Sequence, residues 1–294
     1  MKARHGALIA IVAAILWGFS GTCGQYIFDT FNFDASYLTS IRMLSAGSIL
    51  VIFGLLKDRP VMTGIWNSRK TAVHLRVFAV LGLMLCQLSY MKAIQHTNSG
   101  TATILQYTGP VMIMMLTCAM EKRLPAKKEV VAIIMALLGT FLLATHGDIH
   151  TMVITPLGLI WGILAAVTLV AYTMIPTKLI TRFGSTAVTG YGMVIGGIFL
   201  SFITKLWEAD FPTDIRFYLA FAGIVIFGTV LAYTMYLYGV TLIGPVKASM
   251  IASIEPVAAT VFMIVWLKES FHYMDFFGFL CIFTTIFLLL KKEE

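Results

Sequence analysis

Long apolar runs separated by short polar connections make up most of the chain. Ten such runs can be drawn, each about as long as an α-helix must be to cross the hydrocarbon core of a bilayer. They are continuous rather than alternating, which favours helices over the strands of a membrane barrel. The predicted fold class is therefore all-α, a polytopic membrane protein with ten transmembrane helices. The expected spans are about 6–28, 36–56, 74–95, 99–120, 128–146, 156–176, 186–206, 216–240, 247–267 and 273–290.

The composition supports the same class. Of the 294 residues, 59% are hydrophobic and 12% are charged, and the mean hydropathy is +0.89. In a soluble domain about a quarter of all residues are charged, so a soluble fold is excluded. The cysteines are scattered through apolar segments without a Cys-x-x-Cys pair, which indicates small core residues rather than disulfides or metal ligands. They are Cys23, Cys86, Cys118 and Cys281.

The net charge of +7 has an uneven distribution over the expected loops. If the N-terminus is cytoplasmic, sixteen lysines and arginines fall on the cytoplasmic side and four on the outer side. The four are Lys92, Lys205, Arg216 and Lys268. The positive-inside rule then predicts that both termini are cytoplasmic, in a plasma or inner membrane. The positive charge therefore does not imply a nucleic-acid partner.

Two patterns in the first part of the chain recur in the second part. The Trp-Gly pair at 17–18 returns at 161–162, which is 144 residues further on. The fourth and ninth spans share the pattern Ala-x(7)-Pro-Val, at 102–111 and 248–257, with an offset of 146 residues. Two patterns at nearly one offset predict an internal repeat of the whole membrane segment.

The repeat predicts how the spans are arranged. Segments 1–147 and 148–294 would each hold five helices, and an odd number makes the second copy enter the membrane from the opposite face. Such inverted repeats are an architecture of secondary transporters, whose binding sites lie near the midplane on interrupted helices. Pro110 and Pro256 are expected to break the fourth and ninth spans, because proline lacks the amide donor of a helix interior.

These motifs resemble a known family. The two Trp-Gly pairs, Arg42 in the second span, the two Pro-Val helices, and Glu121 and Glu269 at their ends are similar to the drug/metabolite transporter (DMT) superfamily, EamA type. The resemblance covers essentially the whole chain. It implies a ten-helix inverted-repeat carrier of the inner membrane, and many such carriers export amino acids or other small metabolites. Many members carry Glu-Pro in both halves, whereas here Gly109 stands where the second half has Glu255.

Glu255 is the most informative single residue, since it falls near the middle of an apolar span. A carboxylate at that depth costs several kcal/mol unless it is paired, hydrated or protonated. Pro256 also frees the carbonyl one turn back, that of Ala252. A carboxyl group that binds a proton in one state and a substrate ammonium in another would give proton/substrate antiport. The alternative is that Glu255 is a protonated core residue or a cap on the kink.

Arg42 lies about two turns into the second span. Its long stem would allow the guanidinium to reach outward to the membrane surface. Asp34 and Asp275, near the outer surface, are possible structural partners. The functional alternative is that Arg42 binds a substrate carboxylate.

Aromatic, amide and hydroxyl side chains recur at helical spacing in several spans, which suits an apolar cavity with a few polar groups. Ordinary helix packing is the alternative. Trp17, Tyr90, Tyr107, Trp161 and Tyr233 are expected to line one central space. The complete predicted substrate-binding set is Trp17, Gln25, Arg42, Gln87, Tyr90, Gln106, Tyr107, Trp161, Tyr172, Tyr233, Ser253 and Glu255.

No cofactor and no metal site are predicted. His146, Asp148 and His150 share one short loop, but three residues without a further ligand are a weak metal signal. The sequence also lacks the Walker motif Gly-x(4)-Gly-Lys-Ser/Thr and the His-Glu-x-x-His and Gly-x-Ser-x-Gly motifs of enzymes. An intramembrane enzyme and a channel are the rival classes.

The predicted function is a secondary transporter that moves a small polar metabolite by alternating access. Arg42 and Glu255 together suit a zwitterionic amino acid. Glu255 with Trp17 and Trp161 would equally suit an organic cation, through cation–π contacts. The expected partners are the substrate and the lipid bilayer, as a monomer or a dimer, and both the coupling ion and the direction of transport stay open.

Overall fold

The computed structural model describes residues 2–97, 99–152, 155–267 and 272–290. Every regular element in these ranges is helical. Lys268 and Glu269, two charges used in the sequence analysis, lie outside the described residues, as do Lys291 and Lys292.

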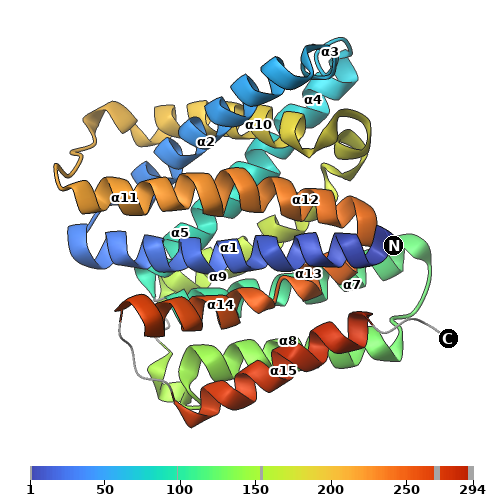
Figure 1. Cartoon of the computed structure of the whole chain (residues 1–294), viewed down its shortest axis with the longest axis vertical. Helices are drawn as coiled ribbons and strands as arrows, with labels where there is room; N and C mark the ends of the chain where they lie inside the picture. The colour runs from blue at the N-terminus through green and yellow to red at the C-terminus, as the bar shows by residue number, and fades with distance from the viewer. Residues whose placement is uncertain (1, 98, 153–154, 268–271, 291–294) are drawn as a thin grey trace.

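The helices form two successive sets of five (Figure 1). The first set is α1 (Lys2–Phe31), α2 (Ala35–Lys57), α4–η1–α5 (Arg69–Val77, Phe78–Met84, Leu85–His96), α6–α7 (Ser99–Gln106, Thr108–Glu121) and α8 (Lys127–Thr145). The second set is α9 (Pro156–Met174), α10 (Thr177–Thr204), α11–η4–α12 (Ile215–Gly223, Ile224–Leu231, Ala232–Ile243), α13–α14–η5 (Pro245–Ile251, Ile254–Phe262, Met263–Leu267) and α15 (Tyr273–Leu290). Short helices α3 (Arg59–Gly64), η2 (Ile149–Thr151) and η3 (Leu206–Glu208) lie in connections.

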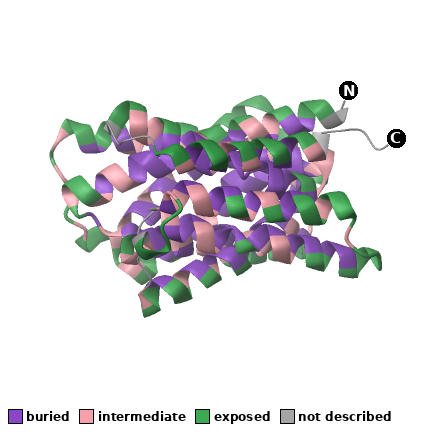
Figure 2. Ribbon diagram, turned by 90° about the horizontal axis from the view of Figure 1, so that it is seen from below, coloured by how far each residue is buried: buried purple, intermediate pink, exposed green. Residues whose placement is uncertain are grey.

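The outer surface of the bundle is apolar. Buried residues fill the interior between the helices, while exposed residues face outward (Figure 2), and many of these are large hydrophobics such as Ile52, Phe202 and Phe287. Among the described residues, nine helices are long and apolar enough to cross a membrane, and α15 is a shorter apolar helix. The start of α1 and the end of α15 lie at the same end of the molecule, as ten crossings require (Figure 1). The ten-helix prediction is confirmed.

The inverted repeat is visible in the irregular parts of the helices. The fourth helix of each set is broken, at Tyr107 between α6 and α7 and at Ala252–Ser253 between α13 and α14. The third helix of each set contains a π-helical segment, and these segments begin at Phe78 and Ile224. The π-helical segments begin 146 residues apart, and Tyr107 and Ser253 are separated by the same number of residues, which is the offset of the Pro-Val pattern in the sequence. Each irregularity of the first half therefore has a counterpart in the second half.

The repeated Trp-Gly pairs pack each half against the broken helix of the other half. A Cβ atom on Gly18 of α1 would lie only 2.7 Å from the backbone nitrogen of Ala259 and the carbonyl oxygen of Glu255 in α14. A Cβ atom on Gly162 of α9 would lie 2.7 Å from the Cβ atom of Leu105 in α6. Glycine lets the two backbones approach this closely, as in other membrane helix pairs.

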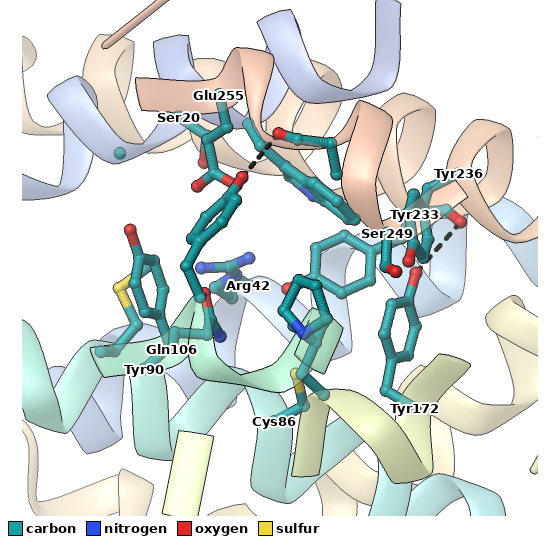
Figure 3. Close-up of a pocket in the computed structure, with 17 residues that line it drawn as sticks. Ser20, Arg42, Cys86, Tyr90, Gln106, Tyr172, Tyr233, Tyr236, Ser249 and Glu255 are labelled. Carbon is teal, nitrogen blue, oxygen red and sulfur yellow. Dashed lines mark hydrogen bonds between the residues drawn. The ribbon is translucent and has the colours of Figure 1, made fainter. Parts of the chain in front are cut away.

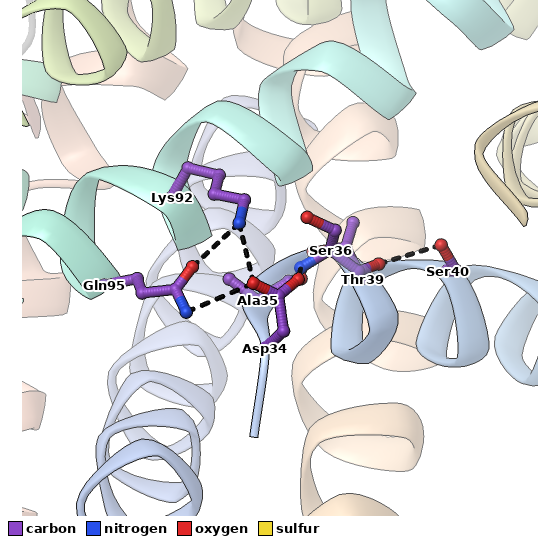
Figure 4. A network of polar contacts seen from close by, with 7 residues as sticks. All are labelled: Asp34, Ala35, Ser36, Thr39, Ser40, Lys92 and Gln95. Carbon is purple, nitrogen blue, oxygen red and sulfur yellow. Dashed lines mark hydrogen bonds and ion pairs between the residues drawn. The ribbon is translucent and has the colours of Figure 1, made fainter. Parts of the chain in front are cut away.

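A polar network fixes the start of α2 against the end of α5 (Figure 4). Asp34 caps α2 by accepting a hydrogen bond from the backbone nitrogen of Ser36 (2.7 Å). Its carboxylate also pairs with Lys92 (2.8 Å) and accepts a bond from Gln95 (3.3 Å). Partial burial raises the pKa of Asp34, but the bonds from Lys92 and Ser36 outweigh this and lower it to about 2. Asp34 is therefore charged at neutral pH and already paired.

Replacing Gly18 with alanine should destabilise the protein, because the new methyl group meets backbone atoms of α14 that cannot rotate away. Overpacking of this kind typically costs about 1–3 kcal/mol of unfolding free energy. The matched control is Gly24→Ala in the same helix, where the nearest atom to the new Cβ is the Met91 sulfur at 3.9 Å. Thermal unfolding in detergent compares the two variants. Equal melting temperatures would contradict the close packing described here.

Candidate functional site

A cavity lies where the two broken helices meet (Figure 3). Side chains from both halves of the chain reach it, so it occupies the interface between the repeats. Its wall is mostly aromatic and aliphatic, with one arginine and one glutamate. The lining residues are Trp17, Ser20, Gly21, Arg42, Cys86, Tyr90, Met91, Gln106, Tyr107, Pro110, Leu169, Tyr172, Tyr233, Tyr236, Ser249, Ala252 and Glu255.

The two helix breaks are joined by a hydrogen bond. The hydroxyl group of Tyr107, at the first break, donates to the carbonyl oxygen of Ala252, at the second break (2.6 Å). This carbonyl lacks its usual helical partner, because Pro256, four residues later, has no amide hydrogen. The backbone nitrogen of Glu255 also donates to it (2.9 Å). The polar group that the proline leaves unpaired is thus satisfied, as a membrane interior demands.

Glu255 lies in the first turn of α14 and opens onto the cavity. Its carboxyl group interacts with the hydroxyl groups of Tyr107 and Tyr90. Tyr90 in turn shares a hydrogen bond with Thr103 (2.9 Å between the two hydroxyl oxygens). Glu255 is therefore held by hydroxyl groups, and within the described residues no lysine or arginine forms an ion pair with it.

Arg42 faces the same cavity and is only 2% exposed. Its guanidinium carbon lies 5.9 Å from the ring centroid of Tyr233 and the group interacts with that side chain. Its Nε and Nη1 atoms have no hydrogen-bond partner among the described residues. A buried guanidinium with unused donors is costly, because the charge has lost water without gaining a counter-charge.

Both structural expectations for Arg42 are wrong. Its burial shows that the side chain does not reach outward to the membrane surface. The two candidate counter-ions are engaged elsewhere, since Asp34 pairs with Lys92 (2.8 Å) and Asp275 with His146 (2.7 Å). Of the alternatives that the sequence offered for Arg42, the one left is that it binds the carboxylate of a substrate.

Four aromatic rings form one wall of the cavity. Trp17 lies 5.2 Å from Tyr233 and 4.9 Å from Tyr236, measured between ring centroids. Tyr172 lies 5.3 Å from Tyr233 and 5.8 Å from Tyr236. The indole nitrogen of Trp17 has no hydrogen-bond partner among the described residues. This wall offers apolar area together with a further unused donor beside those of Arg42.

Eight of the predicted substrate-binding residues lie at the cavity, and so does the helix-breaking Pro110. Four of the five aromatic residues expected around one space are among them. The eight are Trp17, Arg42, Gln106, Tyr90, Tyr107, Tyr172, Tyr233 and Glu255.

Four other predicted residues do not line the cavity. Gln25 donates to both carboxylate oxygens of Asp29 (2.9 Å each) on α1. Trp161 packs against the apolar cluster that contains Met91 and Ala102. The structure thus corrects two expectations that rested on helical spacing alone.

The other two are buried within the protein. The hydroxyl group of Ser253, at the break in the ninth span, donates to the carbonyl oxygen of Met250 (2.6 Å). Gln87 is almost completely buried, and neither atom of its amide has a partner among the described residues. Neither residue is among those that line the cavity.

The sequence analysis left four polar lining residues out of the predicted set. Ser20 lies three residues after Trp17, and Tyr236 three residues after Tyr233, a spacing that places each pair on one helix face. From that spacing, Ser20 and Tyr236 could have been predicted to line the cavity. Cys86 and Ser249 could not have been predicted, because each is a small residue inside an apolar run.

A cavity between two broken helices that belong to inverted repeats is the arrangement of secondary transporters. The comparisons with known proteins agree. The model of the EamA-like transporter family matches residues 4–145 and again 156–291. The chain belongs to the EamA-like transporter family. It is a multi-pass membrane protein and a transporter, and this family does not consist of enzymes.

Individual relatives extend over the whole chain. The chain is 35% identical to the uncharacterized inner membrane transporter YicL of Salmonella typhimurium, over 97% of this chain and 95% of YicL. It is 24% identical to the uncharacterized transporter YetK of Bacillus subtilis, over 100% of this chain and 89% of YetK. A solved crystal structure of 17% identity superposes with a TM-score of 0.80 over 98% of this chain and 96% of the other. This structural similarity supports the fold described above.

Replacing Tyr107 with phenylalanine should lower stability by about 1 kcal/mol, since it removes the hydroxyl group that bonds to the carbonyl of Ala252. The ring remains, so the packing around it is preserved. Tyr218→Phe is the control, because that side chain is exposed. Thermal unfolding of both variants measures the difference. A Tyr107→Phe variant as stable as the control would show that this bond does not hold the two breaks together.

Proposed function

We propose that this transporter carries a zwitterionic, amino-acid-like metabolite by alternating access. The observation that carries the proposal is the pair Arg42 and Glu255, a guanidinium and a carboxyl group that face one cavity without pairing with each other. A substrate with a carboxylate and an ammonium group would satisfy both. The unused Nε and Nη1 donors of Arg42 suit a bidentate bond to the carboxylate.

The aromatic wall supports an apolar or aromatic substrate side chain. Trp17, Tyr172, Tyr233 and Tyr236 present ring faces and edges next to the two charges. Apolar walls with a few placed polar groups are typical of small-molecule sites.

The same rings make an organic cation the second candidate. Such a substrate would pair with Glu255 and lie against the rings through cation–π contacts. It would leave the charge of Arg42 uncompensated, however, and add a second positive charge to a buried space, where repulsion is strong. The zwitterion is therefore the better match.

Proton coupling is the mechanism that we propose for accumulation. Glu255 is the only carboxylate among the described residues that line the cavity. If a proton and the substrate ammonium compete for it, the transporter exchanges one for the other across the membrane. The matching position of the first half is Gly109, where a Cβ atom would lie 2.9 Å from Leu169 and 3.1 Å from the carbonyl oxygen of Ala166. In the first half, packing thus fills the place that a carboxylate would need. Glu255 is left as the one proposed proton site in the cavity.

The orientation and direction of transport are part of the proposal. The loop charges support cytoplasmic termini, and the name of YicL places that relative in an inner membrane. We propose export, and this part of the proposal rests on the family resemblance. We propose a monomer as the transport unit, with a dimer as the alternative.

Glu255→Gln tests the coupling, because it keeps the shape of the side chain and removes its titration. In liposomes the variant should still exchange substrate, about 10–100-fold more weakly bound, since a hydrogen bond to a charged group contributes about 1.5–3 kcal/mol. It should lose accumulation driven by a pH gradient. The control is Glu208→Gln, an exposed carboxylate outside the cavity. Accumulation by Glu255→Gln at the level of the control would exclude Glu255 as the coupling group.

A further inference from the structure

A second cluster of polar groups lies far from the cavity, where the end of α8 meets the start of α15. It consists of His146, His272 and Asp275, each of which offers one metal-ligating atom, and these three atoms lie within 4.8 Å of one another. The start of α15 is at the end of the molecule opposite the start of α1 (Figure 1). In the orientation proposed above, this is the outer surface.

The carboxylate of Asp275 is the fixed part of the cluster. It is 0% exposed. One oxygen accepts a bond from the backbone nitrogen of His272 (2.9 Å), and the other lies 2.7 Å from the Nδ1 atom of His146. A buried carboxylate is stable only beside a compensating positive charge or several donors. One carboxylate oxygen of Asp275 thus already faces the Nδ1 atom of His146, and these are two atoms that could bind the same metal ion.

The two histidines come to this carboxylate from different halves of the chain. His146 ends α8 in the left-handed conformation (φ 51°), which turns the chain at that point. His272 directly precedes α15. The two imidazole rings stack with 4.1 Å between their centroids and 29° between their planes. The stack therefore places two imidazoles, a common ligand type for transition metals, beside one carboxylate.

Access and packing also suit an ion. His272 is exposed and the His146 side chain is 35% exposed, so an ion can enter from the aqueous phase without unfolding. The helices behind the cluster pack tightly, since a Cβ atom on Gly139 of α8 would lie 2.8 Å from Ile282 of α15. The ligands are therefore mounted on two closely packed helices rather than on loops alone.

We propose that His146, His272 and Asp275 bind a divalent transition-metal ion with the preferences of Zn²⁺, which joins the two halves of the transporter at this end. Two imidazoles and one carboxylate are a ligand set that Zn²⁺ uses, and a water molecule completes the tetrahedron. Imidazole ligands disfavour Mg²⁺ and Ca²⁺, which prefer oxygen.

Binding requires only small movements. Ligand atoms about 2.1 Å from a tetrahedral ion are about 3.4 Å apart. The 2.7 Å contact between His146 and Asp275 must open slightly, and the exposed His272 ring must move closer. The ion takes the place of the hydrogen bond between His146 and Asp275 and binds ligand atoms that protons would otherwise occupy. The apparent affinity should therefore weaken as the pH falls.

The test uses the purified protein without an affinity tag, stripped with EDTA and titrated with ZnCl₂. Thermal unfolding and metal analysis should show one bound ion per chain and a melting temperature that rises with the Zn²⁺ concentration, because the ion binds the folded state. His272→Ala should weaken binding at least about tenfold, as expected for loss of a ligand. His150→Ala is the matched control, since this exposed histidine of the same region lies outside the cluster.

A second measurement keeps the proposal testable if His272→Ala melts at a lower temperature even without metal. Co²⁺ in a tetrahedral site absorbs visible light, so the wild type and His150→Ala should develop the band and His272→Ala should not. No stabilisation at millimolar Zn²⁺ would overturn the proposal. Equal binding by wild type and His272→Ala would overturn it as well, and would leave His146 and Asp275 as an ion pair only.

Discussion

The hydrogen bond from Tyr107 to the carbonyl oxygen of Ala252 is the contact on which the centre of this transporter depends. Pro256 leaves that carbonyl without its helical partner, and a bare carbonyl at membrane depth costs several kcal/mol. The partner comes from the equivalent break in the other half of the chain. Because Tyr107 and the backbone nitrogen of Glu255 satisfy this carbonyl, the ninth span does not need to be continuous, and Glu255 can lie at the start of a helix in the middle of the membrane.

The helix packing is similar in the two repeats, whereas the polar residues at the cavity differ between them. Gly18 and Gly162 perform the same packing role in the two halves, each against a broken helix of the opposite half. Glu255 has only Gly109 as its counterpart, where side chain and backbone of α9 fill the space that a carboxylate would need. Arg42 then provides a positive charge without a counter-ion in the protein. The resulting cavity holds one arginine and one glutamate, which is the basis of the proposed zwitterion site.

The sequence predicted the fold better than the site. Span lengths, loop charges and the 146-residue offset depend on local composition and order, so the ten helices and both breaks could be predicted. Trp161 and Gln25 could not be placed, because helical spacing defines a face but not its direction. In a membrane, faces toward lipid and faces toward protein are both apolar, so composition does not separate them. The contact between Asp275 and His146 could not be predicted either, since only the packing of α8 on α15 brings the two residues together.

Binding of a matched ligand series to the wild-type protein tests the central claim, that the charges of Arg42 and Glu255 together select a zwitterion. Apolar and aromatic amino acids would first be screened by calorimetry. The tightest ligand would then be compared with its amide, which lacks the carboxylate charge, and with its deaminated acid, which lacks the ammonium. The account predicts that both analogues bind at least about tenfold more weakly, since each leaves one charge unpaired. Failure of every zwitterion to bind, or an amide that binds as tightly as its amino acid, would contradict it.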